Sequence, residues 1–184
     1  MSVCEETITM FEDWTGSEYE ALVTSFECPP PPPGVYQNPV VNIEYMYGWN
    51  LLSLPLEVVS SFYSDLFPTA VAGTLYGFNG TYEQQSELIP GNGYWLNFNQ
   101  DGTQTITGGA INVLTISLNP GWNLIGGISF ETDSYNIHDP EEIIVPGTIY
   151  EFNGTYVGTG TIAPGKGYWI NGGLGGDITL IAYI

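Results

Sequence analysis

Hydrophobic and polar residues alternate in short stretches over most of the chain. Residues 41–45 place valine, isoleucine and tyrosine at every second position, and residues 114–118 do the same with leucine and isoleucine. An alternation of period two predicts β-strands that bury one face. The 24 glycines and 13 prolines interrupt the chain often, which favours short strands joined by turns over long helices. The pattern predicts an all-β fold.

Residues 39–111 and 112–184 are two tandem copies of one sequence unit. The first of three shared blocks recurs after 73 residues and the other two after 74, so the second copy holds one inserted residue between them. Chance does not produce three such blocks in the same order. The blocks are Gly-Trp-Asn-Leu at 48–51 and 121–124, Tyr-x-Phe-Asn-Gly-Thr-Tyr at 76–82 and 150–156, and Pro-Gly-x-Gly-Tyr-Trp at 90–95 and 164–169.

Each block predicts a local structure. Asn-Gly at 79–80 and 153–154 indicates a two-residue hairpin with a type I′ turn, whose positive φ angles Gly80 and Gly154 supply. Pro-Gly-x-Gly indicates a turn into the following strand. Strands at residues 105–107 and 178–180 then close the copies. About five short strands per copy are typical of a small β-barrel or β-sandwich, so we expect two tandem units of this kind.

Residues 1–28 form an acidic N-terminal arm outside the repeats, with seven of the 20 acidic residues. Ser17 and Glu20 have the spacing of a capping box, and apolar residues follow at helical spacing, which predicts a short helix over 18–27. Cys4 and Cys28 bracket the arm. A disulfide between them would contribute roughly 3–4 kcal/mol and forms outside a reducing cytosol. Two unrelated buried thiols are the alternative.

Residues 29–38 are a proline-rich spacer. The five consecutive prolines from Pro29 to Pro33 predict a polyproline II segment, which acts as a semi-rigid spacer. A role as a proline-motif ligand is the less favoured interpretation.

The charge balance excludes several classes of partner. The chain has 20 Asp and Glu residues against one cation, Lys166, and a net charge of −19. Nucleic-acid binding needs Lys and Arg to neutralise phosphates, and anionic membranes are disfavoured for the same reason. No run of 18 apolar residues is present, so we expect no membrane insertion. The acids indicate a soluble, self-repelling surface or, alternatively, one that collects divalent cations or a basic partner.

No residue has the surroundings that catalysis or metal binding requires. His138 is the only histidine, and no Gly-x-Ser-x-Gly elbow or cysteine partner accompanies it. One histidine with distant cysteines makes a poor zinc site, so we interpret His138 as an exposed loop residue. Carboxylate pairs are expected by number alone in so acidic a chain, although calcium binding in loop 131–142 remains an alternative.

Lys166 replaces Asn92 of the first copy, which indicates a solvated turn lysine. We predict no catalytic, cofactor-binding or metal-ligating residue.

Four tryptophans occupy equivalent positions in the two copies. Trp49 corresponds to Trp122, and Trp95 corresponds to Trp169. A residue present in both copies is more often needed by the shared fold, so we interpret these tryptophans, with Gly80 and Gly154, as fold-defining. Packing in the core is the favoured role of the tryptophans, and a sugar-stacking platform is the alternative.

The three blocks together resemble a β repeat that is common in large bacterial secreted and surface proteins. The resemblance covers residues 39–184 and leaves the first 38 residues outside. It implies an accessory module without a catalytic motif, and its motifs say little about the ligand.

Two functions of different classes follow as expectations. The first is a non-enzymatic structural or decorating protein of an externally exposed assembly, with a virion component as the leading example and residues 1–38 as the contact to a protein scaffold or to copies of itself. Residues 1–6 lack the basic and apolar character of a signal peptide, so such a protein is either processed or released by another route, which Met1 favours. The second is an adhesion or carbohydrate-binding module of a bacterial surface protein, because 5 tryptophans, 13 tyrosines and 8 phenylalanines offer stacking surfaces for glycans. Both place the protein on a virion or an extracellular surface.

Overall fold

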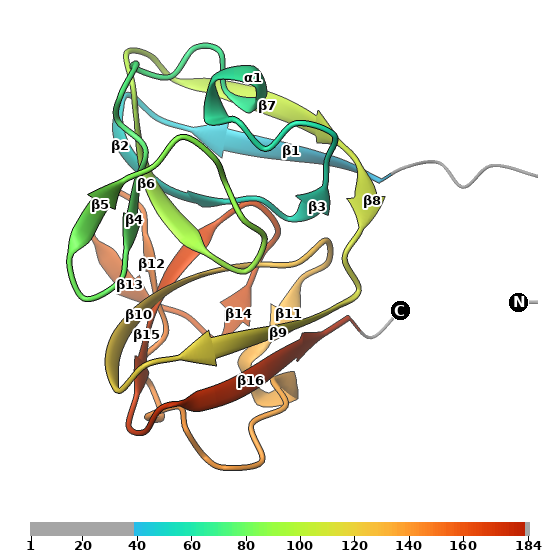
Figure 1. Cartoon of the computed structure of the whole chain (residues 1–184), viewed down its shortest axis with the longest axis vertical. Coiled ribbons are helices and arrows are strands. Elements are labelled where there is room, and N and C mark those ends of the chain that lie inside the picture. Colours follow the sequence, from blue (N-terminus) through green and yellow to red (C-terminus); the bar gives the residue numbers. More distant parts are fainter. Residues whose placement is uncertain (1–38, 183–184) are drawn as a thin grey trace, which may run out of the picture. The chain divides into compact units, whose positions relative to one another are not determined.

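A computed structural model describes residues 39–182, and strands make up most of their regular structure (Figure 1). The helical elements in this range are α1 (Tyr63–Leu66) and the 3-10 turn η1 (Ser134–Asn136). The predicted all-β fold is confirmed. The acidic arm, its helix over 18–27, the proline-rich spacer and the pairing of Cys4 with Cys28 lie outside the described residues.

The first copy is built on a four-stranded antiparallel sheet with two-stranded ribbons beside it. The sheet has the order β2-β6-β4-β5, and the ribbons are β1-β7 and β3-β8. The strands are β1 (Val40–Tyr45), β2 (Gly48–Ser53), β3 (Leu56–Glu57), β4 (Tyr76–Phe78), β5 (Tyr82–Gln84), β6 (Gly93–Phe98), β7 (Gly102–Thr107) and β8 (Gly109–Ala110).

The second copy repeats the four-stranded sheet and the β1-β7 ribbon, whereas its other ribbon pairs different positions from β3-β8. Its sheet has the order β10-β15-β12-β13, and its ribbons are β9-β16 and β11-β14. Each copy has more strands than the five that the sequence predicted, because strands of two or three residues are too short to show an alternation. The strands are β9 (Val113–Leu118), β10 (Gly121–Gly126), β11 (Thr132–Asp133), β12 (Tyr150–Phe152), β13 (Tyr156–Gly158), β14 (Thr161–Ile162), β15 (Gly167–Gly172) and β16 (Gly176–Ile181).

Each copy has its own hydrophobic core, which the predicted alternation supplies. Ile43 and Tyr45 of β1 are buried in the first core, and Ile116 and Leu118 of β9 are buried in the second. Exposed residues separate them along both strands, as the period of two predicted.

The Gly-Trp-Asn block ends the turn between the first two strands of each copy. Asn50 closes this turn: its Oδ1 accepts a hydrogen bond from the Met46 N–H at 2.9 Å, and its Nδ2 donates to the Met46 carbonyl at 2.7 Å. Asn123 makes the same two bonds with Asn119, at 2.9 and 2.8 Å. The asparagine therefore satisfies backbone groups that a tight turn leaves without partners.

The Asn-Gly hairpins are where the sequence placed them, but the predicted type I′ turn is wrong. The paired residues at the ends of the turn are Phe78 and Tyr82, so three residues intervene rather than two. Gly80 has φ +80° and Gly154 has φ +75°, whereas neither asparagine has a positive φ. A type I′ turn requires positive φ at both central residues. In a three-residue loop only the glycine has a positive φ, so the asparagine keeps a negative φ.

The two copies are joined by reciprocal backbone contacts. Residues 39–182 lie in one compact unit. The Ser53 N–H donates to the Gly165 carbonyl at 2.9 Å, and the Gly126 N–H donates to the Gly91 carbonyl at 2.9 Å. Ser53 and Gly126 are equivalent positions, as are Gly91 and Gly165. Such an exchange of contacts is the signature of two-fold symmetry between like units.

The last glycine of Pro-Gly-x-Gly allows the two backbones to approach. A β-carbon on Gly93 would lie 2.6 Å from the Ile125 carbonyl oxygen, and one on Gly167 would lie 2.9 Å from the Leu52 carbonyl oxygen. Both contacts cross from one copy to the other. The block is therefore needed at the junction between copies and not only within each copy.

Replacing Gly93 by alanine should separate the backbones and lower the free energy of unfolding by about 1–3 kcal/mol, as overpacking does elsewhere. Gly158→Ala is the matched control, because its β-carbon would meet only the Tyr150 ring at 3.8 Å, and we expect a change within about 1 kcal/mol. Urea unfolding of both variants measures the difference. Equal midpoints would contradict the close approach.

Candidate functional site

The two faces of each four-stranded sheet carry different side chains. Leu51 of β2 lies opposite Trp95 of β6, and Tyr76 of β4 lies opposite Trp95 from the other side. Paired residues share a face, and so do residues two apart on a strand. The face shared by Leu51, Trp95 and Tyr76 therefore also carries Trp49 and Phe78. The opposite face supplies the core of the copy.

The aromatic faces of the two sheets meet at the junction between the copies. Phe78 of the first copy packs edge-to-face on Trp169 of the second, with ring centroids 4.8 Å apart. Trp95 and Phe152 make the equivalent contact, also at 4.8 Å. Leu51 lies in the same cluster. Edge-to-face pairs add to the free energy of burial, so these rings help to hold the copies together.

Two aromatic hollows flank this junction. Each is lined by two tryptophans and two tyrosines of one copy and by a phenylalanine of the other. Their volumes are about 510 and 410 Å³. The first hollow is formed by Trp49, Tyr76, Tyr82, Trp95 and Phe152, and the second by Trp122, Tyr150, Tyr156, Trp169 and Phe78.

The rims of the two hollows are equivalent in geometry and in exposure. Trp49 and Trp122 are 45% and 46% exposed, and Tyr82 and Tyr156 are 53% and 52% exposed. Trp49 lies 6.0 Å from Tyr76 between ring centroids, and Trp122 lies 5.9 Å from its counterpart Tyr150. The molecule therefore presents the same apolar surface twice.

The prediction that all four repeated tryptophans pack in the core is wrong for two of them. Trp169 is buried, at 9% exposure, and Trp95 is half-buried. Trp49 and Trp122 stand at the rims instead. They follow the turn glycine at the start of β2 and β10, where the partner copy no longer covers the aromatic face.

The hollows carry no net charge at neutral pH. Tyrosines are their only titratable residues, and partial burial raises the pKa of Tyr82. Lys166 is bound elsewhere, because its Nζ lies 2.9 Å from Glu151 Oε2. The expected solvated turn lysine is confirmed, because the Lys166 side chain is 55% exposed.

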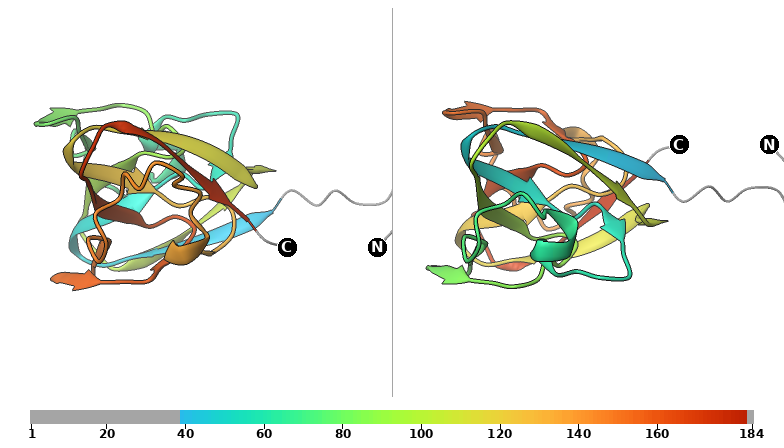
Figure 2. Two further views of the ribbon diagram at one scale, coloured as in Figure 1. Left: turned by 90° about the horizontal axis from the view of Figure 1, so that it is seen from below. Right: turned by 90° about the horizontal axis from the view of Figure 1, so that it is seen from above.

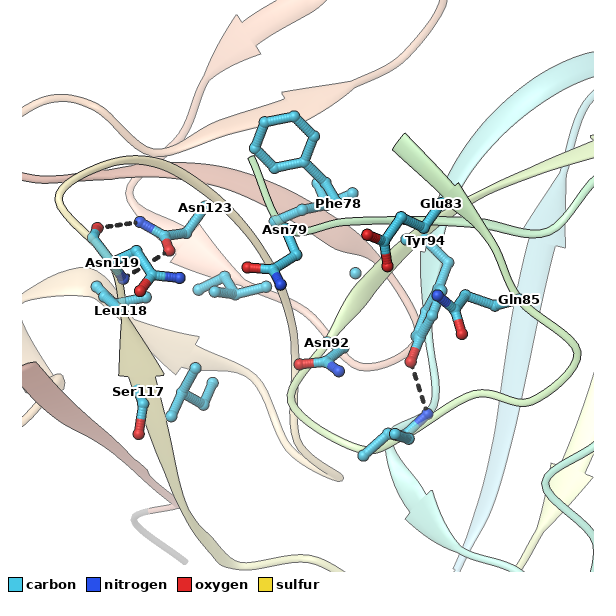
Figure 3. A pocket seen from close by; sticks show the side chains of 16 residues that line it. Phe78, Asn79, Glu83, Gln85, Asn92, Tyr94, Ser117, Leu118, Asn119 and Asn123 are labelled. Carbon is cyan, nitrogen blue, oxygen red and sulfur yellow. Dashed lines mark hydrogen bonds between the residues drawn. The ribbon is translucent and has the colours of Figure 1, made fainter. Parts of the chain in front are cut away.

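A polar cleft of about 330 Å³ lies between the first copy and strands β9 and β10 of the second (Figure 3). Its polar side chains are amides, two hydroxyls and one carboxylate, without a cation. Asn119 and Asn123 are tied together by the turn described above. The polar lining comprises Asn79, Glu83, Gln85, Asn92, Tyr94, Ser117, Asn119 and Asn123.

The two copies differ at this cleft. Gly77 and Asn92 line it in the first copy, and their counterparts in the second copy are the ion pair of Glu151 and Lys166. The second copy therefore has an ion pair where the first copy has the glycine and the amide of the cleft. The hollows, in contrast, have the same five residue types in both copies.

The remaining candidates of the sequence have structural positions. His138 is exposed and forms a backbone bridge with Thr179, at 2.9 Å in both directions. The Asp139 carboxylate accepts hydrogen bonds from the N–H groups of Ile143 and Ile144, at 2.8 and 2.9 Å, so it stabilises its own loop. Over residues 39–182 no three His, Cys, Asp or Glu side chains are grouped to hold a metal ion. In the same range no helix has the length and apolar character to cross a membrane.

Tyr94 and Tyr168, which follow Pro-Gly-x-Gly, extend into the cores. The Tyr168 hydroxyl accepts a hydrogen bond from the Ala163 N–H at 2.8 Å, and the Tyr94 hydroxyl accepts one from Ile89 at 2.9 Å. Burial raises the pKa of Tyr168 to about 12. Each tyrosine hydroxyl thus anchors the backbone just before its own Pro-Gly-x-Gly turn. The tryptophan that follows each tyrosine faces the partner copy.

Sequence reasoning did not assign Tyr76, Phe78 and Tyr82, or their counterparts, to a site. A signal was available, because aromatic residues recur in both copies at alternate positions on either side of the Asn-Gly turn. These residues lie beside the tryptophans because β4 pairs with β6. That pairing cannot be predicted from the sequence alone.

Comparisons of the chain with protein-family models, with curated proteins and with solved structures gave no match. The resemblance to bacterial surface repeats stays a prediction.

The two classes of tryptophan should differ in their effect on stability. Trp169→Ala should lower the free energy of unfolding by about 3–5 kcal/mol, the cost of removing a buried large aromatic residue. Trp122→Ala should cost about 1–2 kcal/mol, because roughly half of that side chain is already in water. Urea unfolding of both variants tests this, and losses of equal size would contradict the assignment of Trp122 to an exposed rim.

Proposed function

We propose that this chain is a non-enzymatic component of an externally exposed assembly and that its two aromatic hollows bind neutral carbohydrate. The observation that carries the proposal is the duplicated apolar surface with exposed tryptophans and tyrosines. Exposed aromatic surface of this kind lowers solubility and marks interaction sites in soluble proteins.

Aromatic rings suit pyranose sugars because the sugar ring has an apolar face of C–H groups and a polar edge of hydroxyls. The C–H face stacks on a tryptophan or tyrosine ring, which is apolar over its face and polar only at its tip. Each hollow offers two tryptophans and two tyrosines. Their indole N–H and phenol O–H groups supply the few hydrogen bonds that fix a ligand's orientation.

The charge of the protein favours a neutral glycan over an anionic one. The net charge is −19, and the single lysine is paired with Glu151. A uronic acid or sulfated sugar would be repelled by the protein's field and would find no cation in the hollows. A neutral glycan is not repelled by the protein's negative charge and needs no cation in the hollow.

The position of the hollows suits a module that reaches outward. The β4–β5 and β12–β13 hairpins, which carry part of both hollows, project from one end of the unit (Figures 1 and 2). Strand β1 begins at the opposite end (Figure 2). A unit joined to a larger assembly through the residues before β1 would present both hollows away from the point of attachment, on a virion or an extracellular surface.

Affinity electrophoresis tests the proposal. Native gels containing hydroxyethyl cellulose, glucomannan or dextran should include at least one that retards the full chain, whereas alginate, which is anionic, should not. The double variant Trp49→Ala and Trp122→Ala should lose the retardation. Tyr135→Ala, which removes an exposed aromatic residue outside both hollows, should keep it. Retardation that survives in the double variant would refute the hollows as the site.

A purely structural, decorating role is the second candidate function. Residues 1–38 lie outside the repeats and contain the only cysteines, seven acidic residues and the five-proline run, a composition that suits contact with a scaffold or with other copies of the chain. Deleting residues 1–33 should then abolish multimers in sedimentation analysis while the melting temperature and the retardation by glycan stay unchanged. A full chain that sediments as a monomer at all concentrations would argue against self-association.

A further inference from the structure

We propose that the two hollows hold two separate glycan chains that run in opposite directions, so that one molecule cross-links its ligand. This inference rests on the proposed function, and it specifies the ligand as a linear glycan and the mode of binding as bivalent. It follows from the symmetry that relates the hollows.

The two-fold relation holds through the junction from backbone to side chains. The hydrogen bonds of Ser53 and Gly126 with the partner copy are both 2.9 Å long. The edge-to-face ring pairs across the junction match at 4.8 Å, with interplanar angles of 76° and 75°. Each of these contacts made by the first copy is returned by the second, which a two-fold axis requires and a translation does not.

A two-fold axis reverses the direction of a linear ligand. Both hairpins project from the same end of the unit (Figure 2), so the axis between the copies passes through the face that carries both hollows. A glycan has a reducing and a non-reducing end. A chain that lies across one hollow in its preferred direction would meet the other hollow in the reverse direction. One chain therefore cannot make the same contacts in both.

The phenylalanines at the junction separate the hollows physically. Phe152 lines the first hollow and packs edge-to-face, at 5.4 Å, on Tyr156 of the second. Phe78 lines the second hollow and packs at 5.4 Å on Tyr82 of the first. Each phenylalanine ring therefore packs on the tryptophan of the hollow that it lines and on the tyrosine of the other hollow, which places it between the two.

The hollows should bind the same class of ligand with similar affinity. Their five residue types are identical, and the rim tryptophans differ in exposure by a single percentage point. Gly77 and Asn92, whose counterparts are Glu151 and Lys166, line the polar cleft and not the hollows. Two equal sites on one face raise the avidity for a long polymer or for a surface coated with it, by about 10²-fold in favourable geometries.

Native mass spectrometry of the full chain with cellohexaose, mannohexaose and isomaltohexaose counts the sites. We expect two hexasaccharides per wild-type molecule, one for Trp49→Ala or for Trp122→Ala, and none for the double variant. One hexasaccharide per wild-type molecule that either single substitution abolishes would mean that a single chain crosses both hollows. That result would overturn the inference and leave the proposed function standing, whereas no binding of any probe would overturn both.

Light scattering with the corresponding polysaccharide tests cross-linking. Wild-type protein mixed with the long polymer should raise the scattering, and either single variant should lose this rise while keeping one binding site. Tyr135→Ala should behave as wild type, and melting curves of all variants control for folding. Two bound hexasaccharides without a rise in scattering would refute the cross-linking.

Discussion

The backbone of Gly93 lies so close to the carbonyl group of Ile125 that no β-carbon fits between them, and Gly167 stands in the same relation to Leu52. These two contacts bring the copies into backbone hydrogen bonding on both sides of a two-fold axis. A side chain at either glycine would hold the sheets apart and would also separate the rings of Phe78 and Trp169. The remaining features of the junction depend on this approach.

The approach also explains why an aromatic surface is left in water. Each four-stranded sheet buries one face in its own core, and its other face is covered only where the partner copy reaches. Trp169 lies under that cover, whereas Trp122 lies beyond it. Two short sheets crossing at a tight junction cannot cover each other completely. The uncovered ends are concave because the partner's phenylalanine closes one side of each.

The chemistry of the surface is unusual for so acidic a chain. The net charge of −19 makes separate molecules repel one another, which opposes association through the two exposed apolar hollows. The same charge selects against anionic ligands. The acidic surface therefore bears both on repulsion between molecules and on the neutral ligand that we propose.

The sequence by itself determined the all-β class, the two copies, the buried alternation at Ile43 and Ile116, and the hairpin tips at Gly80 and Gly154, because each depends on residues that are near neighbours in the chain. It left open whether a repeated tryptophan is buried, since an aromatic side chain in a strand suits both a core and a rim. Only the tertiary structure decided that Trp169 is covered and Trp122 is not, and that Phe78 belongs to the hollow of the other copy. The reason is that these positions depend on how closely two backbones approach across the junction, and that distance is set by contacts between residues of different copies, which are distant in the sequence.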